Sequence, residues 1–130
     1  MTVESEFVAA VVNKAKRDRW AAGLADVRLR PKLLERLWNS GSDWDAPWLI
    51  PLQLTGKRPE QLAAIVGELR RRGAGDNAHA LATSDDLGGR TMSLDEAVDH
   101  FSDDGGAVLI CGPNLALHFP ETGEPLLLAR

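Results

Sequence analysis

Apolar and polar residues alternate most clearly in the last third of the chain, where they predict one capped helix and three short strands. A capping box begins at Ser93, and an apolar stripe at helical spacing follows it. Gly105 and Gly106 then end the helix. Three apolar segments separated by turn residues follow: 107–111, 115–119 and 126–129. Their short Gly-Pro-Asn and Glu-Thr-Gly-Glu turns predict a C-terminal antiparallel meander.

In the first half of the chain, the apolar residues recur at the spacing of a helix instead. It predicts a helix from Thr2 or Ser5 to about Ala22, and a second one from Pro31 to about Trp38. A third helix opens at Pro59, and its apolar stripe is expected to face a sheet and to be almost fully buried. The stripe consists of Leu62, Ile65, Val66 and Leu69. Residues 49–54 suit either a strand at a sheet edge or a loop, because Pro51 cannot donate a backbone hydrogen bond.

These elements predict an α+β fold in one domain over residues 1–130. A helical half, about 1–73, is expected to pack on one face of a mixed sheet of about four strands. Strand 78–83, helix 93–102 and strand 107–111 form a candidate βαβ unit with parallel strands. Together with the meander, this unit covers about 77–130.

Composition narrows the class of protein. A chain of 130 residues with 44% hydrophobic and 26% charged residues is typical of a folded globular domain. The apolar runs are too short to cross a membrane, and Glu4 and Glu6 are unlike the basic start of a signal peptide. We therefore expect a cytoplasmic protein of bacterial style with no membrane partner. The single cysteine, Cys111, excludes an internal disulfide and is expected to be a buried, inert thiol.

The net charge of −4 conceals two halves of opposite sign. Residues 14–72 contain thirteen basic and seven acidic side chains, whereas residues 76–124 contain ten acidic ones and a single base, Arg90. Nucleic-acid binding through the basic half is one alternative function. It is disfavoured, because Lys14, Lys16, Arg17 and Arg19 spread around an ideal helix and form no single phosphate-facing stripe.

Three stretches resemble a group of small bacterial proteins without an established activity. They are Lys14–Trp20, Ser84–Arg90 with the following Leu94–Ala97, and Cys111–Ala116 running on to Phe119. Proteins of that group often carry glycine where this chain has Asn114. The resemblance implies one compact domain and transfers no mechanism.

The loop from Ser84 to Arg90 is the first candidate ligand site. In a parallel βαβ unit it would lie beside the start of the next helix, with Asn114 nearby. The proposed ligand-binding residues are Ser84, Asp85, Asp86, Arg90, Ser93 and Asn114. Arg90 and free backbone N–H groups would suit an anion, whereas the two aspartates would suit a divalent cation. An ordinary turn, with Arg90 paired to one of the aspartates, is the favoured alternative.

One cysteine and two histidines form a second group of candidate residues. Cys111, His79 and His118 offer a nucleophile pair or part of a zinc site, but ordinary strand packing explains them better. The sequence therefore predicts no catalytic residue, no metal site and no cofactor.

The loop with Trp44 and Trp48 is expected to be partly solvated, because Asp43 and Asp45 flank Trp44. Tryptophan is favoured in interfaces, so these two residues are the candidate partner-binding residues, with core packing as the favoured alternative. The function expected first is a non-enzymatic protein-interaction or regulatory module, including an immunity-type binder. The alternatives are a small-molecule or anion-binding domain, an enzyme using the Ser84–Arg90 loop, and nucleic-acid binding. The sequence is also compatible with a homo-oligomer.

Overall fold

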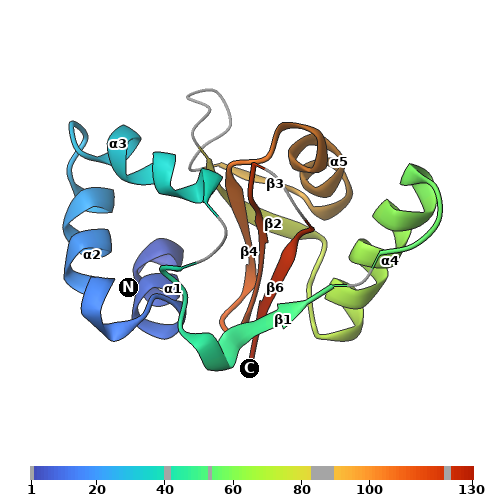
Figure 1. Cartoon of the computed structure of the whole chain (residues 1–130), viewed down its shortest axis with the longest axis horizontal. Helices are drawn as coiled ribbons and strands as arrows, with labels where there is room; N and C mark the ends of the chain where they lie inside the picture. The colour runs from blue at the N-terminus through green and yellow to red at the C-terminus, as the bar shows by residue number, and fades with distance from the viewer. Residues whose placement is uncertain (1, 40–41, 53, 83–89, 122–123) are drawn as a thin grey trace.

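A six-stranded antiparallel sheet lies between two layers of helices in the computed structural model (Figure 1). The structure describes residues 2–39, 42–52, 54–82, 90–121 and 124–130. The chain is an α+β domain, as predicted. The strands, in their order across the sheet, are β1 (Leu49–Pro51), β6 (Leu126–Ala129), β5 (Leu115–Phe119), β4 (Ala107–Gly112), β2 (Asn77–Ala82) and β3 (Thr91–Ser93).

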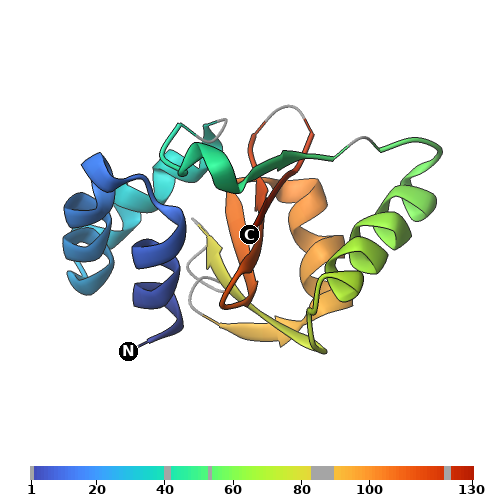
Figure 2. The ribbon, with the colours of Figure 1, turned by 90° about the horizontal axis from the view of Figure 1, so that it is seen from below.

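Helices cover both faces of this sheet, and not the single face that was expected (Figure 2). One layer holds α1 (Val3–Val11), α2 (Arg17–Ala25) and α3 (Arg30–Leu34), with the short 3₁₀ helices η1 (Lys14–Lys16), η2 (Glu35–Trp38) and η3 (Ala46–Trp48). The other layer holds α4 (Arg58–Arg71) and α5 (Leu94–Asp104). Alternate strand residues enter the two cores, so Ala80 packs with the α4–α5 layer and Leu81 with the α1–α3 layer.

The prediction of a parallel βαβ unit is wrong. Strand β2 pairs antiparallel with both of its neighbours, β3 and β4, and Ala80 lies opposite Leu109. The physical reason is β3, a strand that the sequence pattern does not predict. It runs back along β2, so α5 starts near the beginning of β2 and the chain re-enters the sheet as an antiparallel strand. The sheet is therefore antiparallel throughout, with six strands where about four were expected.

The meander and the edge position of β1 are confirmed. The first predicted helix is divided. Val12 leaves the helix and pairs with Trp44, while the backbone N–H of Asn13 donates to the Asp43 carbonyl at 2.8 Å. This pairing occupies the backbone that a continuous helix would need.

The third predicted helix, α4, is confirmed, but its stripe is buried only in part. Ile65 and Leu69 are buried, whereas Leu62 and Val66 are half-buried.

Candidate interaction surface

The predicted ligand loop is described only at its end. Residues 83–89, which include Ser84, Asp85 and Asp86, lie outside the described residues. Arg90 is exposed, and its carbonyl accepts a hydrogen bond from the Ala80 N–H at 2.9 Å. Ser93 is the N-cap of α5, as predicted, because its hydroxyl accepts the Glu96 N–H at 3.3 Å.

Asn114 lies away from the point where β2 ends. Because β2 and β4 are antiparallel, Ala82 at the end of β2 lies opposite Ala107 at the start of β4. Asn114 follows the far end of β4, and its carbonyl accepts the Arg130 N–H at 3.3 Å. The geometric reason for grouping Asn114 with the 84–90 loop therefore fails.

Both indoles of the tryptophan loop are packed into the core. Trp44 and Trp48 are each only 4% exposed, which confirms core packing for them, while Ala46 and Pro47 between them are exposed, so the loop is partly solvated as expected. Trp44 packs against Phe7, Trp20 and His118 with ring centroids 5.4 Å apart in each case. The two side chains therefore offer almost no surface to a partner.

Asp43, beside Trp44, is also buried and accepts hydrogen bonds from three side chains. The donors are Lys16 Nζ at 2.7 Å, Arg36 Nη2 at 2.6 Å and Trp20 Nε1 at 2.9 Å. Burial by itself would raise the pKa of Asp43, but these donors hold it well below its usual range. Asp43 thus joins η1, α2 and η2 as a buried ion.

The candidate nucleophile Cys111 and His118 lie on opposite faces of the sheet. Burial raises the pKa of the Cys111 thiol to about 12, so the reactive thiolate is disfavoured. His118 is buried in the other core. His79 and Cys111 both line a mostly apolar recess of about 280 Å³ beneath α1. Among the residues that the structure describes, three metal-ligating side chains meet nowhere.

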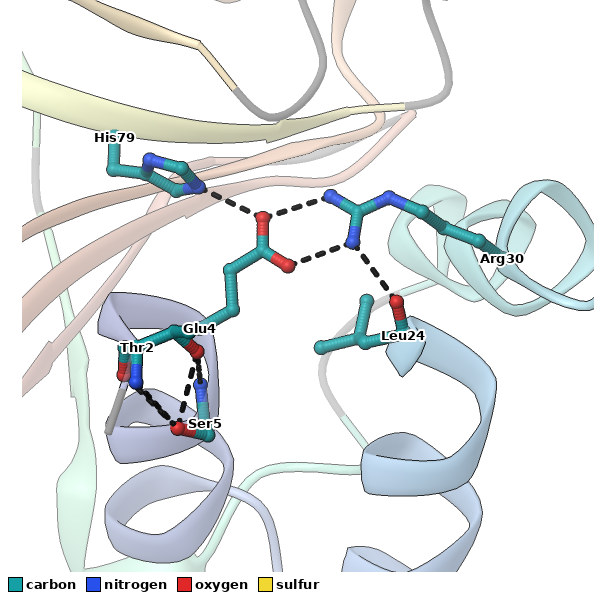
Figure 3. A network of polar contacts seen from close by, with 6 residues as sticks. All are labelled: Thr2, Glu4, Ser5, Leu24, Arg30 and His79. Carbon is teal, nitrogen blue, oxygen red and sulfur yellow. Dashed lines mark hydrogen bonds and ion pairs between the residues drawn. The ribbon is translucent and has the colours of Figure 1, made fainter. Parts of the chain in front are cut away.

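His79 instead belongs to a network with Glu4 and Arg30 (Figure 3). The Arg30 guanidinium donates to both Glu4 carboxylate oxygens, at 2.6 and 2.7 Å, and His79 Nε2 lies 2.8 Å from Glu4 Oε2. Burial alone would raise the pKa of Glu4, but these bonds lower it to about 2. The network ties the first turn of α1 to the start of α3 and to β2.

Arg30 also fixes the turn between α2 and α3, which we call the α2–α3 turn and define as Asp26–Arg30. Its Nη1 donates to the Leu24 carbonyl at 3.2 Å. The Asp26 carbonyl accepts the N–H groups of Leu29 and Arg30 at 3.1 and 2.9 Å, and its Oδ1 accepts the Arg28 N–H at 2.8 Å. The turn is therefore held at both ends and in its middle.

This turn carries most of the large apolar side chains that the described structure exposes. Val27 is 87% exposed and Leu29 is 51% exposed; Val3, on α1, is 46% exposed. Arg28 on the turn and Lys32 just after it, on α3, are exposed cations, and the exposed Glu35 follows them at the start of η2. The arrangement offers two apolar side chains on a fixed turn beside positive charge.

Sequence reasoning missed this surface. It ended one helix near Gly23 and began the next at Pro31, which left the residues between them as an unremarked connection. The available signal was the presence of Val27 and Leu29 in a connection where polar residues and glycine are usual.

Comparisons with protein-family models, with curated proteins and with solved structures return no match. In the part of the chain that the structure describes, every helix is too short or too polar to cross a bilayer.

Proposed function

We propose that this protein is a non-enzymatic protein-interaction module that binds its partner through the α2–α3 turn. The observation that carries the proposal is the exposure of Val27 and Leu29 on a turn fixed by hydrogen bonds. Burying exposed apolar surface drives association. A turn that is already ordered loses less conformational entropy on binding than a flexible one.

Three titratable side chains that the structure describes have structural partners, and this supports a binding role over a catalytic one. His118 and Asp43 are held by hydrogen bonds inside the fold, and the Glu4 carboxylate is occupied by Arg30 and His79. These groups act as internal ties between elements. We also propose a cytoplasmic location, because a single free, buried cysteine suits a reducing compartment.

Affinity capture with matched variants tests the proposal. Wild-type protein, Val27→Asp and Ala64→Asp would each be used to capture proteins from the cells that produce the chain. Ala64 is exposed on α4, on the opposite side of the sheet, so its variant adds the same charge elsewhere. We expect a protein that wild type and Ala64→Asp retain, and that Val27→Asp loses by about tenfold or more.

Thermal unfolding provides the control for folding. Because Val27 is mostly exposed, Val27→Asp should leave the unfolding temperature close to that of wild type. Equal capture of every protein by a folded Val27→Asp variant would remove the α2–α3 turn as the binding surface.

A further inference from the structure

We infer that the partner of the α2–α3 turn presents an acidic surface with apolar side chains at its centre. This inference rests on the proposed function and concerns the chemistry of the partner. It follows from the position of Arg28, which lies between Val27 and Leu29 in the chain and is exposed like them. A surface that covers both apolar side chains also covers part of the Arg28 side chain.

Two acidic side chains beside the turn are already occupied. Glu4 holds Arg30 through two hydrogen bonds, and Asp26 is half-buried with its Oδ1 on the Arg28 backbone N–H. Among the described residues, no carboxylate forms an ion pair with the Arg28 guanidinium. Lys32, at the third position of α3, adds a second exposed cation.

Covering an unpaired guanidinium removes it from water, and this is unfavourable unless a charge-matched acceptor replaces the water. A carboxylate can accept two parallel hydrogen bonds from arginine, which makes it the best replacement. Acidic side chains on the partner would also attract the positively charged turn before contact. The partner chemistry that fits is therefore an acidic surface with apolar side chains at its centre.

Two synthetic amphipathic helical peptides serve as probes. Both carry a leucine face, and the polar face is glutamate in one and lysine in the other. Binding to the full chain is followed by the backbone amide shifts of residues 25–30 and 32, since Pro31 has no backbone N–H. We expect the glutamate peptide to shift these amides and the lysine peptide to leave them unchanged.

Charge-reversal variants make the test specific. Arg28→Glu/Lys32→Glu should weaken binding of the glutamate peptide by about fivefold or more. Lys57→Glu/Arg130→Glu, which changes the net charge equally at exposed positions outside the turn, should change it by less than about twofold. Both variants alter exposed side chains, so their folding is checked by the unchanged amide spectrum of the sheet.

The outcomes separate the two proposals. Equal binding of both peptides at the turn, or no shift in residues 25–32 with either, overturns the acidic-partner inference. Neither result affects the Val27-dependent capture that tests the proposed function. Binding to phosphatidylserine-containing vesicles through Val27, without binding of the glutamate peptide, would also overturn it, because the surface would then recognise a membrane.

Discussion

Trp44 Nε1 donates a hydrogen bond to His118 Nδ1 over 3.0 Å inside the core. Because Nδ1 is the acceptor, the proton of the neutral imidazole lies on Nε2, which donates to the Leu37 carbonyl at 2.7 Å. One buried side chain thus joins β5, the Trp44 loop and η2. Burial also lowers the pKa of His118, which favours this neutral form.

Replacing His118 by leucine should destabilise the protein by about 2–4 kcal/mol, because the Trp44 N–H and the Leu37 carbonyl would both lose their partner. The measurement is the free energy of unfolding in urea at pH 7. His100→Leu is the control, since His100 is half-buried on α5 and on the other face of the sheet. Equal free energies for both variants would contradict the role of His118.

Stability should fall in two stages as the pH decreases. The folded state lowers the pKa of His118 below 6.5, so below that pH the unfolded chain binds more protons and is favoured. Glu4 acts in the same direction at lower pH, because its pKa falls from 4.5 to about 2 on folding. The stabilisation that the ionised Glu4 carboxylate provides is lost as the pH falls from 4.5 to about 2. Asp43 adds to this loss, because folding lowers its pKa as well.

Urea denaturation at a series of pH values checks both stages. The difference in stability between wild type and His118→Leu should shrink as the pH falls below 6.5. A constant difference between pH 7.5 and 5 would show that protonation of His118 does not oppose folding.

The local elements could be predicted from the sequence because local signals determine them. The alternation of apolar residues defines β4, β5 and β6, and Ser93 with its downstream stripe defines α5. Pairing direction depends on non-local contacts. Thr91–Ser93 is too short and too polar to be recognised as a strand, yet its pairing with β2 decides that β4 is antiparallel.

The burial of the two candidate partner-binding tryptophans depends on distant contacts for a related reason. Trp44 lies beside Asp43, but Asp43 is neutralised by distant Lys16 and Arg36, and this allows the carboxylate and the neighbouring indole to be buried. The turn that exposes Val27 and Leu29 likewise has a contact from a distant element, because Glu4 on α1 pairs with Arg30 at the end of the turn.

Leu69→Ala should cost about 2–5 kcal/mol, the usual range for a fully buried leucine. Leu62→Ala, in the same helix, should cost clearly less, because Leu62 is half-buried and loses fewer contacts. The measurement is the free energy of unfolding of the two variants in a chemical denaturant. Both replace leucine by alanine in the same helix, so their difference reports burial and not helix propensity. Equal costs would contradict the placement of α4 on the core.

Ser93→Ala should destabilise the protein by about 1 kcal/mol, because the Glu96 N–H loses its acceptor at the start of α5. Ser42→Ala is a suitable control, since Ser42 is exposed in a loop and its carbonyl, not its hydroxyl, accepts the Asn13 side-chain amide. Urea denaturation distinguishes the two. A loss no larger than that of Ser42→Ala would mean that the cap contributes little.

Glu4→Gln tests whether the ion-pair network of Glu4, Arg30 and His79 helps to order the proposed binding surface. The change removes the charge that pairs with Arg30, and because both side chains are partly exposed we expect a loss of only about 1–2 kcal/mol. Glu6→Gln, in the same first turn of α1 but exposed, reproduces the change in the helix-dipole interaction. Amide hydrogen exchange should accelerate at Leu29 and Arg30 in Glu4→Gln and not in Glu6→Gln, because Arg30 then holds the turn less firmly. If exchange at these amides is the same in both variants, the α2–α3 turn is ordered by its own hydrogen bonds and the network serves only to attach α1.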